Sequence, residues 1–216
     1  MRRPTLAGKP MRLVLCVLAL VVGVAGTASA QGALRISTSL GSFTPVLPLV
    51  SVNDGQNPDV ELESATAATL EMGIAARPWV TLYAGVTYAQ PRLALSGAME
   101  SAEVNGATAR TSLLIPTAGV LLSGALRSST VRPTLRLGLG VKSYRFDLAE
   151  QDGRVGNLTG DLGIGLSAEE GPVTMTAEAR WLPSSFKVSS LPIRATGDTR
   201  QAQHDWIFQL GFRFRP

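Results

Sequence analysis

The sequence predicts an all-β protein: an eight-stranded antiparallel up-and-down transmembrane β-barrel preceded by a cleaved signal peptide. Two observations lead to this prediction. Side chains alternate between apolar and polar with a period of two along eight segments, which is the pattern of β-strands. Long and short connections between these segments alternate along the chain, as they do in membrane barrels. We therefore divide the 216-residue chain into a signal peptide, 1–30, and a barrel domain, 31–216.

The first thirty residues have the three parts of a secretory signal peptide. A basic start precedes an apolar run, 13–26, and Ala28-Ser29-Ala30 supplies the small residues that a signal peptidase requires before Gln31. The basic residues are Arg2, Arg3, Lys9 and Arg12. The apolar run is 14 residues long, whereas a helix needs about 20 to span a membrane. We therefore expect cleavage after Ala30.

Charge and cysteine content change when this segment is removed. Its four basic residues come from a total of 20, so 16 basic residues remain against 16 acidic ones. Nucleic-acid binding then loses its electrostatic basis, and no nucleic-acid partner is expected. The single cysteine, Cys16, also leaves with the signal peptide, which excludes disulfides and thiolate metal sites. No cofactor and no metal site is predicted.

The first three predicted strands, 34–40, 70–74 and 80–88, each have one apolar face. Strand by strand, these faces are Leu34, Ile36 and Leu40; Leu70, Met72 and Ile74; and Val80, Leu82, Ala84, Val86 and Tyr88. The intervening positions are small, polar or charged, so each segment is expected to be a strand with two distinct sides.

The fourth and fifth strands are less regular. Residues 111–124 have apolar residues at both parities and contain Pro116, so we count a strand there without assigning its register. In the fifth, 135–148, apolar residues occupy odd positions up to Val141 and even positions from Tyr144 onward. A change of parity within a strand predicts a β-bulge.

The last three strands, 161–167, 173–181 and 204–214, alternate clearly. Their apolar faces are Leu162, Ile164 and Leu166; Val173, Met175, Ala177, Ala179 and Trp181; and Trp206, Phe208, Leu210, Phe212 and Phe214. The predicted long connections are 42–60, 90–108, 149–157 and 186–202, and short turns lie near 77–78, 127–130 and 169–172. Short turns face the periplasm in membrane barrels and long loops face outward.

Alternation does not show which face points into the barrel. A soluble ligand-binding barrel of the periplasm would cover its outer wall with charge. Here the polar face is mostly small residues, and only two lysines, Lys142 and Lys187, follow the signal peptide. That face suits a narrow lumen, so the apolar face is predicted to meet outer-membrane lipids.

Charged residues of both signs lie on the predicted lumen face. They are Arg35, Glu71, Arg136, Lys142, Asp161, Glu178, Arg180 and Arg213. Arginines and carboxylates satisfy one another in a dry space, so we expect a salt-bridged, largely plugged lumen; a proton relay or ion path is the alternative.

The end of the chain resembles a known family. Gln209, Gly211, Phe212 and Phe214 look like the C-terminal signal that the barrel-assembly machinery recognises, followed here by Arg215-Pro216. With the strand count and loop asymmetry, residues 31–216 resemble the small bacterial outer-membrane protein β-barrel domain, similar to the OmpA-barrel, OmpX and OmpW groups. The resemblance implies an outer-membrane location in a Gram-negative cell and handling by periplasmic chaperones.

His204 is the residue that could have a catalytic role. His204, beside Asp205, is the only histidine, and a lipid-modifying enzyme would require it to act with a serine or an acid. No serine is tied to it by sequence, so we predict no enzyme, with an outer-membrane lipid-modifying enzyme at His204 as the alternative.

Two loops contain apolar residues that could contact a small hydrophobic ligand. Leu47 and Leu49 lie in the first predicted outer loop, and Leu191 and Ile193 lie in the last. The alternative is that the two loops cap the barrel mouth or lie in the lipid headgroup zone. The predicted function is thus a non-enzymatic outer-membrane barrel contributing to envelope structure, surface contact, or capture and passage of small hydrophobic ligands.

Overall fold

The structure, a computed structural model, describes residues 34–49, 59–96, 110–124, 130–148, 151–187 and 200–214. The predicted signal peptide, 1–30, lies outside the described residues. The strands are β1 (Leu34–Pro45), β2 (Asp59–Leu62), β3 (Ala65–Arg77), β4 (Val80–Ala89), β5 (Leu93–Ser96), β6 (Arg110–Ser123), β7 (Val131–Leu148), β8 (Gln151–Glu170), β9 (Val173–Lys187) and β10 (Arg200–Phe214).

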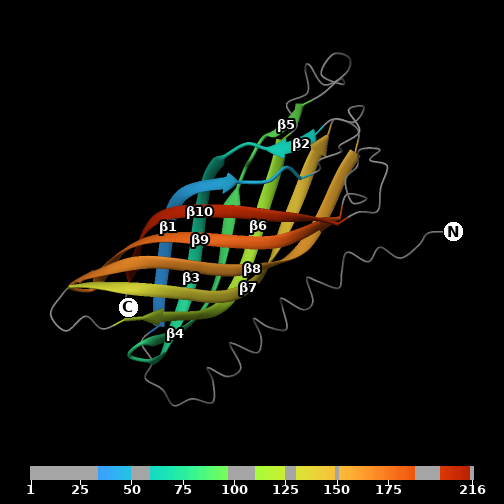
Figure 1. The fold of residues 1–216 in the computed structure, drawn as a ribbon. Coiled ribbons are helices and arrows are strands. Elements are labelled where there is room, and N and C mark those ends of the chain that lie inside the picture. The colour runs from blue at the N-terminus through green and yellow to red at the C-terminus, as the bar shows by residue number, and fades with distance from the viewer. Residues whose placement is uncertain are drawn as a thin grey trace.

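Eight of these strands close into one barrel. Their order around the wall is β1-β10-β9-β8-β7-β6-β4-β3, with every neighbouring pair antiparallel and β1 paired to both β3 and β10 (Figure 1). Closure removes the unpaired edges that an open sheet would leave along its sides. The predicted eight-stranded antiparallel barrel is confirmed, and residues 111–124 lie mostly in β6.

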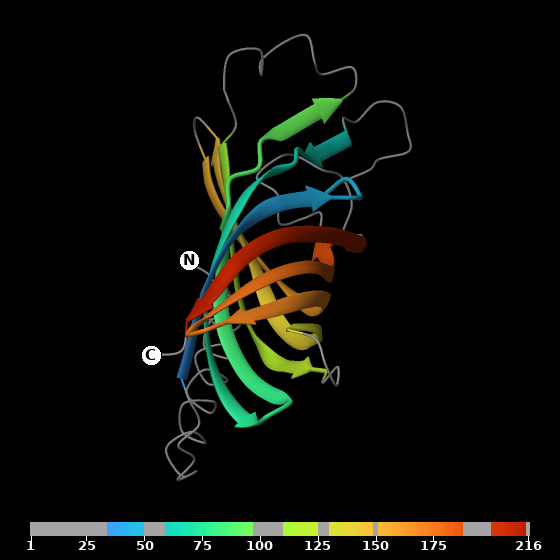
Figure 2. The same cartoon turned by 90° about the vertical axis from the view of Figure 1, so that its left-hand side faces the viewer.

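The two ends of the barrel differ. At one end, which we call the short-turn end, β3 joins β4 and β8 joins β9 by tight turns, and Ile36 of β1 stands opposite Phe214 of β10. At the other, the long-loop end, β2 and β5 form a separate two-stranded sheet that extends the molecule past the barrel (Figure 2). The predicted connection 149–157 is wrong over most of its length, because β8 begins at Gln151 and pairs with β7 from there.

The outer wall is apolar and the interior is charged. Leu210, Ile164 and Leu139 are 71, 66 and 64% exposed, whereas Arg180 and Asp161 are fully buried inside the barrel. The predicted orientation is confirmed, and a barrel with its apolar face inside is excluded for this wall. Among the described residues, no helix is long and apolar enough to cross a membrane.

The predicted β-bulge in the fifth strand is wrong. The β7–β8 ladder runs without a register shift from Val131 opposite Ala168 to Leu148 opposite Gln151. Tyr144 is fully buried and lies on the same strand face as the buried Lys142. The parity of the apolar residues changes because the lumen lining changes from charged to apolar, while the strand itself stays regular.

An apolar cluster fills the lumen near the long-loop end. Every barrel strand contributes to it, and two residues from beyond the barrel wall, Leu49 and Leu62, complete it. The contributors from the barrel strands are Phe43, Ala67, Ala89, Leu113, Ile115, Tyr144, Val155, Leu182 and Ile207. We call this set the apolar cluster.

Candidate functional site in the barrel lumen

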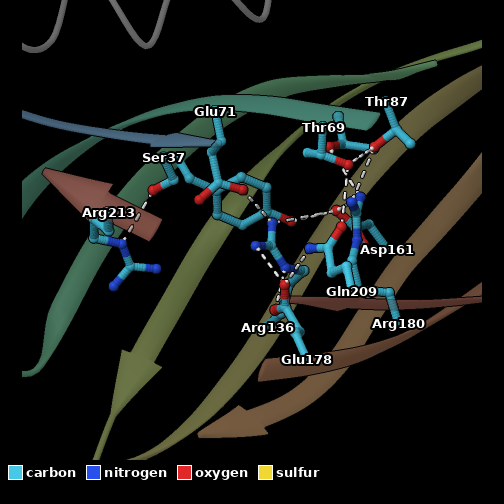
Figure 3. A network of polar contacts seen from close by, with 12 residues as sticks. Ser37, Thr69, Glu71, Thr87, Arg136, Asp161, Glu178, Arg180, Gln209 and Arg213 are labelled. Carbon is cyan, nitrogen blue, oxygen red and sulfur yellow. Dashed lines mark hydrogen bonds and ion pairs between the residues drawn. The ribbon is translucent and has the colours of Figure 1, made fainter. Parts of the chain in front are cut away.

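A network of charged side chains occupies the half of the lumen nearer the short turns, and Arg136 of β7 is its centre (Figure 3). Arg136 Nη1 lies 2.7 Å from Glu71 Oε2 and 3.7 Å from Asp161 Oδ2. Its Nε and Nη2 donate to the two carboxylate oxygens of Glu178 at 2.6 and 3.0 Å. One guanidinium thus binds carboxylates from β3, β8 and β9, and ties together strands that are not all neighbours.

A second arginine, Arg180 of β9, forms a two-point ion pair with Asp161. Its Nε and Nη2 each donate to one Asp161 oxygen at 2.9 Å, the geometry that makes arginine–carboxylate pairs strong. Tyr83 donates from its hydroxyl to Asp161 Oδ2 at 2.8 Å, and Arg136 lies over the Tyr83 ring at 4.2 Å from its centre. A Cβ at Gly138 would overlap the Tyr83 hydroxyl, so glycine makes room for this ring.

Hydroxyl and amide groups connect the arginines to the closing strand β10. Arg180 Nη1 donates to Thr87 Oγ1 at 3.1 Å, and the hydroxyls of Thr87 and Thr69 are 2.9 Å apart. Thr69 donates to Gln209 Oε1 at 3.1 Å, and Gln209 Nε2 donates to Glu178 Oε2 at 2.8 Å. Gln209 therefore holds β10 to residues of β3 and β9. We call this connected set the charged network.

Two further arginines lie nearer the short-turn end. Arg213 Nε donates to Ser37 Oγ at 3.2 Å, and Arg35 Nη1 donates to Thr81 Oγ1 at 3.3 Å. A cavity of about 20 Å³ lies among Arg136, Arg213 and their neighbours. That volume accommodates about one water molecule.

A separate ion pair lies between the charged network and the apolar cluster. Lys142 Nζ donates to Asp205 Oδ2 at 2.6 Å, to the Leu182 carbonyl at 2.7 Å and to Ser184 Oγ at 2.9 Å. Both charged side chains are fully buried. Beside them, Tyr144 donates from its hydroxyl to Gln203 Oε1 at 2.9 Å. Buried polar side chains therefore also lie next to the apolar cluster.

The structure bears out the predicted lumen charges and adds to them. Six of the eight are buried and the other two, Arg35 and Glu178, are partly buried. Tyr83, Gln209 and Asp205 were not singled out as lumen residues from the sequence. Strand parity contains the signal for all three, because Tyr83 alternates with the apolar face of β4, and Gln209 and Asp205 lie at odd positions of β10 together with Arg213.

His204 and Asp205 point to opposite sides of β10. Asp205 is buried in the lumen, whereas the His204 ring stacks on Trp181 of the outer wall, with centroids 5.6 Å apart. Trp206 also stacks on Trp181, with ring centroids 6.5 Å apart. The two neighbours therefore do not form an acid–histidine pair. Within the residues that the structure describes, no group of three or more histidines, cysteines or carboxylates could hold a metal ion.

The predicted loop and terminal residues fall in different environments. Leu47 is 38% exposed, and Leu49 is buried in the apolar cluster; Leu191 and Ile193 lie outside the described residues. Phe212 and Phe214 are about half exposed on the outer wall. Gly211 lies at the seam between β1 and β10, where a Cβ would come within 2.6 Å of the Thr38 carbonyl oxygen.

Two solved outer-membrane proteins resemble this chain in structure. Neisserial surface protein A is 12% identical, with a TM-score of 0.58, and the match covers 85% of this chain and 97% of that one. The outer membrane protein OprG from Pseudomonas aeruginosa is 15% identical, with a TM-score of 0.54 and coverage of 85 and 95%. No family model and no curated protein matches the sequence.

At these identities the likeness concerns the fold alone. An apolar outer wall around a charged interior suits hydrocarbon outside and a dry, paired lumen inside. The chain therefore has the fold of the small eight-stranded outer-membrane β-barrels, with an apolar wall suited to lipid.

Proposed function

We propose that this protein is a closed, non-enzymatic outer-membrane barrel that contributes to envelope structure and surface contact without passing solutes through its lumen. The apolar cluster is the observation that carries the proposal. All eight barrel strands send a side chain into it, so water or an ion would have to displace packed apolar groups around the whole circumference. The charged network lies beneath it as a second plug.

Electrical recordings test the closed lumen. We expect the purified full chain to insert into planar bilayers without discrete conductance steps, while a pore-forming porin gives steps under the same conditions. Steady steps with a fixed amplitude, abolished by antibody or protease, would overturn the proposal.

Assembly is proposed to depend on the aromatic end of β10. Phe212 and Phe214 lie on the outer wall at the seam that closes the barrel, where an assembly factor could pair with the strand before closure. Replacing both with alanine should lower the fraction of heat-modifiable, membrane-inserted protein in cells. Phe208→Ala, on the same face of the same strand, is the control; equal loss from both would contradict a terminal signal.

Processing after Ala30 also belongs to this proposal. Secretion across the inner membrane requires the basic and apolar segments of residues 1–30 to act as a leader. N-terminal sequencing of the protein from outer membranes should begin at Gln31. An outer-membrane form that begins at Met1 would contradict it.

A second candidate function is capture of a small hydrophobic ligand at the long-loop end. Val46 and Leu47 are 57 and 38% exposed, on the segment that joins Phe43 and Leu49 of the apolar cluster. An apolar fluorophore should bind the detergent-solubilised barrel, and Val46→Ser with Leu47→Ser should weaken binding. Leu49 is left intact because it is buried, and Leu70→Ser on the outer wall is the control. Unchanged binding by the loop variant would exclude this function.

A further inference from the structure

Arg213 of β10 is a buried cation without an ion-pair partner among the described residues. The residue is 9% exposed, and its Nε donates to Ser37 Oγ at 3.2 Å. Its two terminal nitrogens, Nη1 and Nη2, make no hydrogen bond or ion pair with any residue that the structure describes. Figure 3 shows them pointing away from Ser37. Buried charges in proteins are normally paired, so these N–H groups are available to a ligand.

Positive charge is in excess in the half of the lumen nearer the short turns. Arg136 or Arg180 binds each of the three carboxylates described there, which are Glu71, Asp161 and Glu178. Two more arginines, Arg35 and Arg213, donate to hydroxyl groups. Four arginines thus stand against three carboxylates in this part of the described lumen, and the exposed rim pair of Arg132 and Glu169 is balanced. A bound anion would neutralise the remaining positive charge.

A cavity of about 20 Å³ lies against Arg213, with room for one water-sized occupant. Hydroxyl groups of β1, β7 and β9 also line it, and they belong to Ser37, Ser39, Thr134 and Thr176. The last three make no side-chain hydrogen bond within the described residues. The Ser37 hydroxyl accepts from Arg213 and keeps its own proton to donate. Glu71 and Glu178 line the cavity too, but both already bind Arg136. Free donors therefore surround this space.

We propose that the cavity binds a single small monovalent anion of the size of chloride, between the terminal nitrogens of Arg213 and the surrounding hydroxyls. The guanidinium gives the anion charge-assisted hydrogen bonds, and the anion balances the excess charge of this half of the lumen. The volume admits one atom, so sulfate, phosphate and carboxylates are excluded. Arg213 stands opposite Ser37 near the short-turn end, so the ion enters without crossing the apolar cluster. The site is therefore independent of the proposed function.

Urea unfolding of the full barrel in lipid vesicles tests the site. Sodium chloride is titrated against sodium gluconate at constant ionic strength, so that surface charges are screened equally. Because the anion binds only the folded barrel, chloride at about ten times its dissociation constant should lower the unfolding equilibrium constant of wild-type protein about tenfold. R213Q should lose this chloride effect. The control R132Q removes an arginine of the exposed rim pair and should keep it.

X-ray diffraction from crystals grown with bromide in place of chloride identifies the occupant. We expect one anomalous peak between Arg213 and the hydroxyls in wild-type protein, and none there in R213Q. Electron density for water without an anomalous signal would overturn the proposal, and so would a chloride effect of equal size in wild-type protein and R213Q. Heat-modifiable migration on a gel shows whether R213Q folds. If it does not fold, the bromide peak in wild-type protein decides the matter.

Discussion

The two halves of the lumen are packed with different kinds of side chain. Near the short turns, arginines and carboxylates form ion pairs such as that of Arg180 with Asp161. The strength of such pairs depends on hydrogen-bond geometry and on every buried polar atom having a partner. Near the long loops, the lumen is occupied mainly by the packed side chains of the apolar cluster, beside the Lys142–Asp205 pair. A narrow barrel can thus be filled with either kind of side chain. Removing one charged partner should destabilise the barrel strongly, whereas truncating an apolar side chain should destabilise it in proportion to the volume removed.

Removing Arg136 should give the largest loss of stability. Arg136→Met leaves the buried Glu71 and the partly buried Glu178 without their main cation. Breaking one buried pair costs about 3–5 kcal/mol, so we expect the loss of both contacts to cost about 5 kcal/mol. Urea unfolding in lipid vesicles, followed by tryptophan fluorescence, measures it. Arg136→Lys, which keeps the charge, should lose less; equal losses would show that charge is unimportant there.

Truncating the apolar cluster should cost somewhat less. Phe43→Ala removes a fully buried ring, and such truncations cost about 3–5 kcal/mol through lost burial and the cavity left behind. Phe208→Ala on the outer wall, where lipid can refill the space, is the control in the same unfolding experiment. Similar losses from both variants would contradict a tightly packed cluster.

The buried Lys142–Asp205 pair tests whether apolar side chains can replace an ion pair next to the apolar cluster. Lys142→Met strands the buried Asp205 carboxylate and should cost about 3 kcal/mol. Adding Asp205→Leu should recover at least half of that loss, because the neighbouring apolar cluster can accept another apolar side chain. Unfolding midpoints of the single and double variants measure the recovery. Failure to recover would show that this pair belongs with the charged network.

The smallest effect is expected at the barrel rim. Arg132 and Glu169 form an ion pair at 3.3 Å with side chains 42 and 34% exposed. Exposed pairs of this kind contribute about 0–1 kcal/mol and are screened by salt. Arg132→Gln should therefore shift the unfolding midpoint little, and the shift should vanish at high salt. A large, salt-insensitive loss would mean that the charged network extends to the rim.

Strand parity predicted the fold and the lumen charges but failed where both faces of a strand are apolar. The parity change at Tyr144 was interpreted as a bulge, and residues 111–124 had no clear face. Both have the same cause, because Leu113, Ile115 and Tyr144 enter the apolar cluster while Leu114 faces outward at 45% exposure. A strand with lipid on one side and an apolar lumen on the other contains apolar residues at both parities, and one sequence cannot separate that case from a slipped register.

By itself the sequence determined the strands, the lipid-facing side and the charges that enter the lumen, because these follow from local periodicity and composition. Tertiary structure alone decided which charges meet. Arg136 joins Glu178, 42 residues away, and Tyr83 joins Asp161, 78 residues away, through the register that barrel closure imposes on distant strands. It also decided that β6 parts from β4 at the long-loop end, since ladder length depends on the paths of neighbouring strands.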